Sequence, residues 1–390
     1  ILLVWSLIIL LATFGQRRFA YYFAANVALL SGYLSWAVLK FTGFKETIAK
    51  PVEASEKLKQ EKAKLKKRPK KRSRLTLIHL NMALGAIIVF FLVFFPNIFP
   101  AMAAASQTEF APDRAWLNSL SWLEENTPEP FGDPVAYYQL YEPPPGGKYE
   151  YPESAYGVMA WVDYGYWIAR IAHRPANVTP GPGGKYVAKF FVSQNEDSTQ
   201  EVNWKTKWEE EIIPEKAIMD KLGSSYIIID YQTAGGKFWA LANWAEREQT
   251  EFFDIYYISQ EKGKLTPVQL FHPAYFRSMV SRLYNFDGQA VTPKESIVIS
   301  YEEKVVQDQS IKIKLITDVH KFTSYEEATA FISSQQSGNH QIVSDNPFIS
   351  PVPLEALKNY KLIYSSSILK VQPGVGGIPA VKIFEYTARK

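Results

Sequence analysis

Residues 161–167 read WVDYGYW, and this stretch gives the clearest indication of what kind of protein the chain is. It places an indole N–H donor, Trp161, two residues before a carboxylate, Asp163, among several aromatic side chains. A carboxylate surrounded by rings is costly to bury unless a hydrogen-bond donor satisfies it. A ligand that carries a hydroxyl group, such as a Ser or Thr side chain, would be such a donor. The stretch therefore predicts a site that reads a peptide. The alternative is a structural turn in which the chain itself satisfies Asp163.

The first hundred residues are much more apolar than the rest. Residues 1–14 could complete a spanning helix that begins upstream, because the chain starts inside an apolar run without a methionine. We therefore expect a piece of a longer protein. Phe19–Phe41 and Leu75–Phe99 are each long enough to cross a bilayer, and we expect Pro96 and Pro100 to end the second of them.

A basic segment over residues 45–74 separates the two apolar stretches and is the main source of the positive net charge of +4. Lys- and Arg-rich loops stay in the cytoplasm, so we expect this loop inside and everything after Pro100 outside the cytoplasm. Because the positive net charge comes largely from this loop, it says little about the rest of the chain, and we predict no nucleic-acid partner. Arg17 and Arg18 then lie at the outer face, where they could anchor a helix at the interface or bind a lipid phosphate.

The remaining residues predict a mixed α/β region that is rich in aromatic side chains. Residues 107–127 read as an amphipathic helix with Trp116, Leu117, Leu120 and Leu123 on its apolar face. Residues 212–222 read as a second helix, and 226–229 as a buried strand. After about residue 290 alternating strands dominate, at 296–301, 311–318, 362–366 and 381–386. We predict a multi-domain membrane protein with five parts: 1–42, the last part of a transmembrane helix bundle; 43–74, the basic cytoplasmic loop; 75–100, the final transmembrane helix; 101–289, a helix-rich extracytoplasmic core domain; and 290–390, a β-rich peripheral module.

A second group of residues complements the aromatic stretch. Asp230, Thr233, Lys237 and Leu241 are spaced three, seven and eleven residues apart, so a continuous helix would present all four on one face. Gly235-Gly236 predicts a kink in that helix. The alternative is a helix N-cap at Asp230 or Thr233 with a solvated lysine behind it.

These residues carry a family resemblance. WVDYG at 161–165 resembles the Trp-Trp-Asp-Tyr-Gly signature of oligosaccharyltransferase catalytic subunits. Residues 230–241 resemble the archaeal form of that family's second motif, which is Asp, two residues, Met, three residues, Lys, three residues and Ile. Residues 16–23 and 279–288 are similar to segments of the archaeal members. Order and spacing agree, so the resemblance covers essentially the whole chain.

The resemblance implies a multi-pass cell-membrane glycosyltransferase of the GT-C class that acts as a single-subunit enzyme in protein N-glycosylation. Such enzymes transfer an oligosaccharide from a dolichyl phosphate or pyrophosphate carrier to Asn in an Asn-X-Ser/Thr sequon. The implied partners are an acceptor polypeptide, the dolichyl-linked oligosaccharide and membrane lipid. Trp161 and Asp163 would hold the Ser or Thr hydroxyl, and Arg18, with Arg17 beside it, would contact the lipid phosphate. The implied sequon-binding set is Trp161, Val162, Asp163, Tyr164, Gly165, Asp230, Thr233, Lys237 and Leu241.

The chain departs from the family pattern at three positions. Val162 replaces the second Trp and so removes one indole donor, Thr233 replaces Met, and Leu241 replaces Ile. The family's acidic catalytic residues and metal ligands lie upstream of this chain. The five histidines, at 79, 173, 272, 320 and 340, lack metal-ligand spacing. We therefore expect no catalytic or metal site in this chain, which alone would be inactive, and a Mn²⁺ or Mg²⁺ ion bound by the missing N-terminal part.

Two other function classes remain open at this stage. A non-catalytic, membrane-anchored extracytoplasmic module that binds peptides or glycans would also need an aromatic site outside the membrane. Another GT-C enzyme, such as a protein O-mannosyltransferase, would not need the pocket of Trp161 and Asp163. The chain also contains a sequon of its own, Asn177-Val178-Thr179, but Pro180 follows it and disfavours modification.

Overall fold

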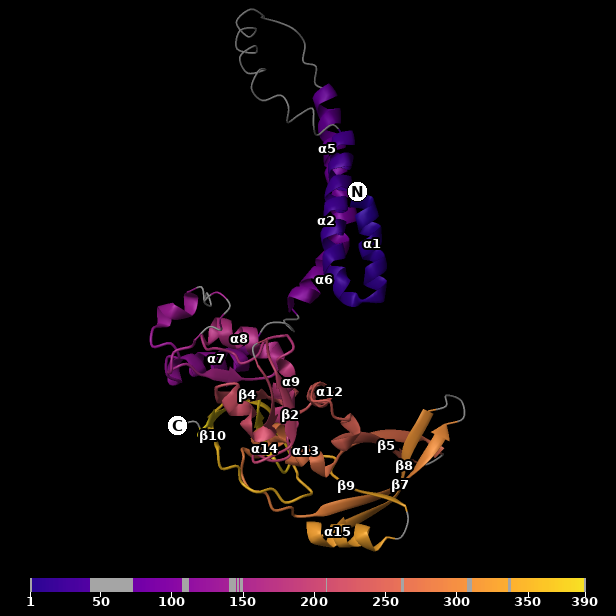
Figure 1. Ribbon diagram of the computed structural model, residues 1–390. Coiled ribbons are helices and arrows are strands. Elements are labelled where there is room, and N and C mark those ends of the chain that lie inside the picture. Colours follow the sequence, from indigo (N-terminus) through magenta and orange to yellow (C-terminus); the bar gives the residue numbers. More distant parts are fainter. Residues whose placement is uncertain are drawn as a thin grey trace, which may run out of the picture. The chain divides into compact units, whose positions relative to one another are not determined.

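A computed structural model describes residues 2–42, 73–106, 112–139, 145, 147, 150–207, 209–260, 263–306, 311–335 and 338–388. For residues 18, 73–79, 306 and 311 it describes the backbone alone. Most of the predicted basic loop and the first residues of the helix predicted from 107 therefore lie outside the described residues. The chain divides into two compact units, Ile1–Ala111 and Pro112–Lys390 (Figure 1).

The described residues of the N-terminal unit are almost entirely helical. Its elements are α1 (Leu2–Gly15), the 3₁₀ turn η1 (Arg17–Phe19), α2 (Ala20–Phe41), α5 (Ser73–Val89), the π-helical turn η2 (Phe90–Phe94) and α6 (Phe95–Ser106). Two stretches, Ala20–Phe41 and Leu80–Ser106, are long and apolar enough to cross a membrane. Helix α1 is shorter than that, so the larger bundle of the predicted fold class is not shown by the described residues.

The prediction that Pro96 and Pro100 end the last span was wrong, because the helix continues through both to Ser106. The π-helical turn lies directly before Pro96. Such turns change the local hydrogen-bond pattern and so accommodate the donor that a proline lacks. The amide of Asn97 also donates to the carbonyl of Val93 at 2.6 Å.

A four-stranded sheet forms the centre of the second unit, in the order β1-β4-β13-β10. Strand β4 (Ser224–Asp230) pairs in parallel with β1 (Gly157–Met159) and antiparallel with β13 (Val381–Tyr386). Strand β10 (Tyr360–Ser365) completes the sheet beside β13. The side chains of Ile227, Ile228 and Ile229 are fully buried. A continuous apolar run is what a strand covered on both faces requires, and it confirms the buried strand predicted here.

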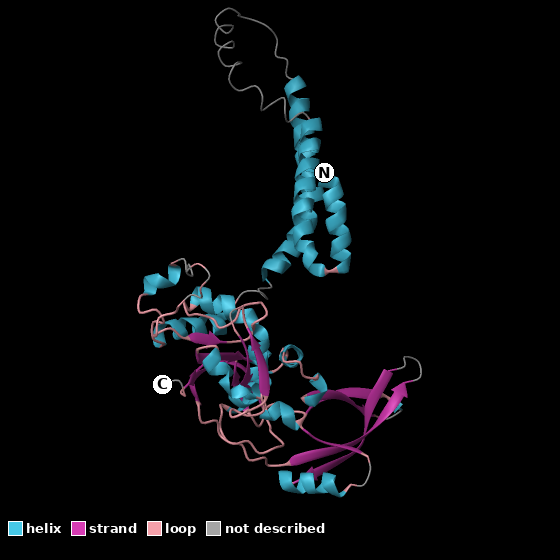
Figure 2. Ribbon diagram, viewed as in Figure 1, coloured by secondary structure: helices cyan, strands magenta, loops and turns pink. Residues whose placement is uncertain are grey.

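Short helices surround this sheet in the same unit (Figure 2). The first, α7 (Arg114–Asn126), begins where the Asp113 carboxylate accepts from the backbone N–H of Trp116 at 2.8 Å. It buries Trp116, Leu120 and Leu123, as predicted for an amphipathic helix, but Leu117 of the predicted face is 43% exposed. The others are η3 (Pro134–Tyr138), η4 (Val162–Tyr164), α8 (Gly165–Ile171), α9 (Gly184–Val192), η5 (Glu215–Ala217), α10 (Ile218–Lys221), α11 (Tyr231–Ala234), α12 (Phe238–Trp244), η6 (Gln249–Glu251), α13 (Pro273–Arg277) and α14 (Met279–Phe286).

A five-stranded sheet extends from this core, in the order β6-β5-β8-β7-β9, and α15 (Tyr325–Ser334) packs against it (Figure 1). Its strands are β5 (Phe253–Ser259), β6 (Leu265–Phe271), β7 (Ser296–Val306), β8 (Ile311–Phe322) and β9 (Asn339–Val343). Two hairpins complete the unit: β2 (Glu201–Lys205) with β3 (Glu210–Pro214), and β11 (Ile368–Gln372) with β12 (Gly376–Pro379).

Two predictions about this unit differ from the structure. Residues 212–222 are not one helix, because β3 continues to Pro214 and only η5 and α10 follow. Exposed Ile212 and buried Ile213 alternate as strand residues do. The boundary at 289/290 also does not coincide with a sheet boundary, because β5 and β6 precede it in the five-stranded sheet while β10 and β13 follow it in the central one.

Candidate functional site

The WVDYG stretch follows strand β1 and turns directly into a helix. Trp161 has extended backbone, Val162–Tyr164 form a 3₁₀ turn, and α8 starts at Gly165. A Cβ atom on Gly165 would lie 2.1 Å from the carbonyl oxygen of Val178, so only glycine permits this close approach. The turn points Val162 and Tyr164 inward, both 4% exposed, and leaves Asp163 at the surface.

Asp230 lies at the end of β4, and its carboxylate accepts four hydrogen bonds. As the N-cap of α11, its Oδ1 accepts from the backbone N–H of Thr233 at 2.8 Å and from the Thr233 hydroxyl at 2.6 Å. Its Oδ2 accepts from the Tyr164 hydroxyl at 2.6 Å and from the Trp116 indole N–H at 3.4 Å. Burial raises the pKa of Asp230 above its ordinary value, while these hydrogen bonds act in the opposite direction.

Tyr164 connects this buried carboxylate to the surface. Its ring packs against Trp116 at 4.3 Å and Trp167 at 5.3 Å between centroids. Burial, with the neighbouring charge of Asp230, raises the pKa of the Tyr164 hydroxyl well above its ordinary value. The hydroxyl therefore keeps its proton and acts as a donor to Asp230.

Lys237 brings the two predicted motifs together. It follows the Gly235-Gly236 break between α11 and α12, and its backbone N–H donates to the Gln232 carbonyl at 2.7 Å. Its Nζ donates to Asp163 Oδ2 at 2.8 Å and to the Tyr164 hydroxyl at 3.0 Å, and it lies 4.6 Å from the centre of the Tyr164 ring. The side chains of Lys237 and Asp163 are 32% and 49% exposed, so this ion pair is open to solvent and to a ligand.

The predicted single helical face does not form. Asp230 has extended backbone, and the glycine pair divides the segment into the short helices α11 and α12. Thr233 and Leu241 are consequently fully buried. Thr233 donates to Asp230, and Leu241 packs in the core. These two residues therefore stabilise the site from within the core and are not exposed to a ligand.

Trp161 precedes Asp163 of the ion pair by two residues in the sequence, and it is 4% exposed. Its ring meets that of Trp244 edge to face at 5.5 Å. The Trp161 N–H has no hydrogen-bond partner among the described residues, and its nitrogen atom is not completely buried. This donor is therefore unpaired and keeps some solvent exposure, although the residue as a whole is buried. Val162, by contrast, points away from the surface, because a Cβ on Gly184 would meet its Cγ1 at 2.3 Å.

The predicted phosphate-binding arginines belong to the N-terminal unit. Arg17 is exposed in the 3₁₀ turn between α1 and α2, whereas the side chain of Arg18 lies outside the described residues. Among the described residues, no group of three or more His, Cys, Asp or Glu could hold a metal ion.

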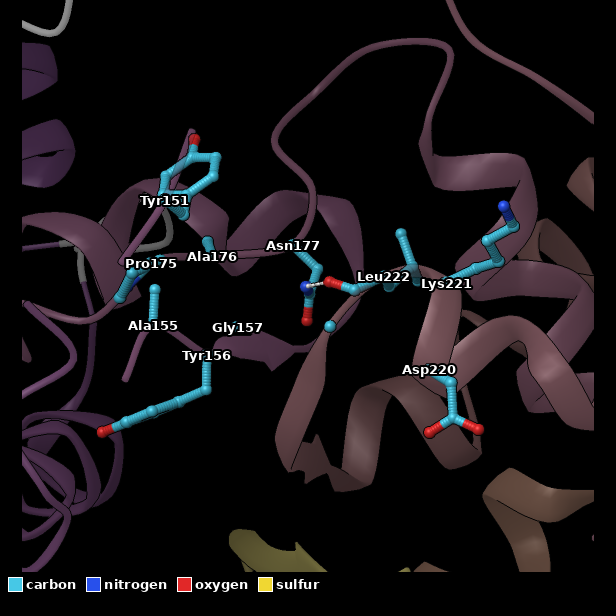
Figure 3. A pocket seen from close by; sticks show the side chains of 11 residues that line it. Tyr151, Ala155, Tyr156, Gly157, Pro175, Ala176, Asn177, Asp220, Lys221 and Leu222 are labelled. Atoms are coloured by element: carbon cyan, nitrogen blue, oxygen red, sulfur yellow. Dashed lines mark hydrogen bonds between the residues drawn. The ribbon is translucent and has the colours of Figure 1, made fainter. Parts of the chain in front are cut away.

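A separate cavity of about 350 Å³ contains none of the predicted acceptor-binding residues (Figure 3). Asn177 of the chain's own sequon lies at its centre, between Gly157 and Leu222. The Asn177 amide donates to the Leu222 carbonyl at 2.6 Å, and its oxygen accepts from the Ser224 hydroxyl at 2.8 Å. Both ends of this side chain are thus occupied within the fold.

Sequence reasoning missed Trp116 and Trp244 as members of the site. Trp116 was predicted on a buried helix face, but nothing in the sequence links it to Asp230, which is 114 residues away. Trp244 follows Leu241 by three residues, so continuing the periodicity of the second motif could have identified it.

Comparison with known proteins agrees with the resemblance. Residues 113–234 match the family model of the AglB core domain. The dolichyl-phosphooligosaccharide-protein glycotransferase 3 of Archaeoglobus fulgidus is 28% identical over 322 residues, which cover 75% of this chain and 32% of that protein. The dolichyl-monophosphooligosaccharide-protein glycotransferase AglB of Haloferax volcanii is 26% identical over 411 residues, which cover 95% and 34%. The chain thus spans about a third of the length of these relatives.

Two solved structures share the fold. A crystal structure of an A. fulgidus oligosaccharyltransferase in complex with Zn and sulfate has a TM-score of 0.50 and 21% identity, covering 99% of this chain and 44% of that one. Another, tethered through a disulfide bond to an acceptor peptide with an NVT sequon, has the same TM-score and identity and covers 99% and 43%. The resemblance to archaeal oligosaccharyltransferases is confirmed.

Proposed function

Because the chain is a homologue of the archaeal AglB-type oligosaccharyltransferases, we propose that it supplies the acceptor-recognition part of such an enzyme. The enzyme transfers an oligosaccharide from a dolichyl phosphate or pyrophosphate carrier to Asn in Asn-X-Ser/Thr sequons. The observation that carries this proposal is the surface pair of Asp163 and Lys237, with the unpaired indole N–H of Trp161 two residues earlier in the sequence. A solved relative holding a peptide with an NVT sequon supports the same substrate class.

The geometry suits a hydroxyl group two residues after the acceptor asparagine. The hydroxyl would donate to the Asp163 carboxylate, and its oxygen would accept from the Trp161 N–H. Lys237 fixes the carboxylate through its Oδ2 atom. A peptide with Ala at this position offers neither contact, so the Trp161 N–H stays unpaired while Asp163 keeps only Lys237 as its partner. That costs about 1–3 kcal/mol, which corresponds to about a 5- to 150-fold preference for Ser or Thr.

The catalytic metal belongs elsewhere in this proposal. An Mn²⁺ or Mg²⁺ ion would polarise the leaving phosphate, but the described residues offer no cluster that fits a divalent ion. We place its ligands and the acidic catalytic groups outside this chain. Arg17 and Arg18 would contact the lipid-linked phosphate at the membrane surface. This assigns the second unit, with its sequon site, to the extracytoplasmic side of a multi-pass cell-membrane enzyme.

The test uses the full-length enzyme, a dolichyl-linked donor, and matched peptides containing Asn-X-Thr or Asn-X-Ala. The wild type is expected to glycosylate only the first peptide efficiently, and Asp163→Ala is expected to abolish that preference. Asp345→Ala serves as the control, because Asp345 is exposed and makes no side-chain hydrogen bond or ion pair among the described residues. Unchanged turnover by Asp163→Ala would refute the assignment. Peptide binding without any transfer would favour a non-catalytic peptide-binding module.

A further inference from the structure

A hydroxyl group can make three hydrogen bonds, one as a donor and two as an acceptor. In the proposed site Asp163 accepts its proton and Trp161 donates to one of its lone pairs. Val162 has no donor to offer to the second lone pair, and its side chain packs inward over Gly184. The residues predicted from the sequence therefore leave one lone pair of the sequon hydroxyl without a hydrogen-bond donor.

Trp244 is the candidate for the missing donor, because its ring contacts that of Trp161. It is the last residue of α12, its ring meets that of Trp161 edge to face at 5.5 Å, and it is 36% exposed. A Cβ built on Gly184 would meet Val162 Cγ1 at 2.3 Å and Trp244 Cζ3 at 2.6 Å. Trp244 and Val162 thus share the space above one glycine, which indicates that a large side chain at 162 and the indole of Trp244 exclude each other.

The orientation of the Trp244 ring follows from the same contact. The atoms nearest Gly184 are Cζ3 and Cε3, which form the ring edge opposite the N–H group. The buried edge is therefore the apolar one, and the exposed part of the ring includes the side that carries the donor. The Trp244 side chain makes no hydrogen bond among the described residues, so its N–H is available to a ligand.

We propose that Trp244 is a further acceptor-binding residue, whose indole N–H donates to the sequon hydroxyl beside Trp161 and replaces the donor that Val162 lacks. This inference rests on the proposed function and adds one residue to its substrate site. It also explains how Val can occupy the second position of the aromatic signature without loss of a donor, since the donor comes from α12.

The test compares Trp244→Phe with Trp239→Phe in the full-length enzyme. Both residues are exposed tryptophans of α12, but only Trp244 contacts Trp161. Trp244→Phe keeps an aromatic ring and removes the N–H, so we expect the KM for an Asn-X-Thr peptide to rise about two- to tenfold, with kcat unchanged. Trp239→Phe is expected to leave KM unchanged. Equal effects of the two variants, or an unaltered KM in Trp244→Phe, would overturn the proposal.

Trp244→His provides the rescue, because histidine restores a ring N–H. Its KM is expected to fall between those of the wild type and Trp244→Phe, and a KM no lower than that of Trp244→Phe would show that the N–H is not what Trp244 contributes. Transfer to the Asn-X-Ala peptide distinguishes a failure of the proposed function from a failure of the role of Trp244. A wild type that does not discriminate Thr from Ala refutes the proposed function. If the wild type does discriminate and Trp244→Phe discriminates equally well, only the role of Trp244 fails.

Discussion

Replacing Asp230 by Ala tests the buried half of the site. The substitution removes the N-cap of α11, which costs about 1 kcal/mol. It also leaves the Tyr164 and Thr233 hydroxyls without their acceptor, although these residues are 4% and 0% exposed. Each unsatisfied buried donor costs about 1–3 kcal/mol, so the expected loss of unfolding free energy is about 3–7 kcal/mol. At about 2–4 °C per kcal/mol for domains of roughly this size, the Tm should fall by at least about 6 °C. A calorimetric Tm within 2 °C of the wild type would refute this account of Asp230.

The pH dependence of the same site has a definite sign. Burial raises the pKa of Asp230 in the folded protein above the ordinary value of an aspartic acid, so the folded state binds this proton more tightly than the unfolded state. The corresponding stability is fully present below the unfolded value and is lost as pH rises through the folded one. Asp230→Asn keeps an acceptor oxygen but cannot titrate. The Tm difference between wild type and Asp230→Asn should therefore shrink from acidic to neutral pH, and a difference that grows would contradict the direction of the shift.

Three further substitutions test other parts of the structure. Lys237→Met removes a solvent-exposed ion pair, which contributes about 0–1 kcal/mol; we expect little change in Tm and a raised acceptor KM, and an effect confined to the KM of the lipid donor would count against the placement of Lys237. Gly184→Ala adds a Cβ 2.3 Å from Val162 Cγ1; overpacking should cost about 1–3 kcal/mol, seen in thermal unfolding, and a Tm equal to that of the wild type would contradict it. Asn177→Asp loses the amide donor to the Leu222 carbonyl and should lower the Tm, while mass spectrometry of the wild type should find Asn177 unmodified.

Local sequence patterns predicted the individual elements better than their partners. The run IIID at the end of β4 and the amphipathic residues of α7 predicted a buried strand and a helix, as found. Strand β13 could not be assigned to a sheet in this way, because VKIFEY would suit either one. It pairs with β4, in a register that places Val381 opposite Asp230, 151 residues earlier in the chain. Long-range packing decides such pairings, and a single-sequence pattern does not contain it.

The site shows the same division between local and long-range information. Asp163 and Lys237 were predicted to form one pocket through the family resemblance, and they are hydrogen-bonded across 74 residues of sequence. The assumed continuous helix failed at Gly235-Gly236, where the backbone leaves helical geometry. That break places Lys237 at the surface and Thr233 in the core, a separation that periodicity alone could not predict. The roles of the predicted residues in binding acceptor and lipid phosphate remain predictions.

The two carboxylates of the site are held in opposite ways, and the difference suits a peptide-binding surface. Asp230 accepts four hydrogen bonds and is 3% exposed, so it is fixed and has no capacity left for a ligand. Among the described residues Asp163 is bonded only by Lys237, at Oδ2, which leaves Oδ1 without a partner there. A sequon hydroxyl can therefore bind Asp163 without displacing Lys237. Because Tyr164 contacts both Lys237 and Asp230, the rigid buried carboxylate positions the exposed one. Loss of Lys237 should consequently weaken acceptor binding rather than abolish it, whereas loss of Asp163 removes the acceptor of the hydroxyl proton itself.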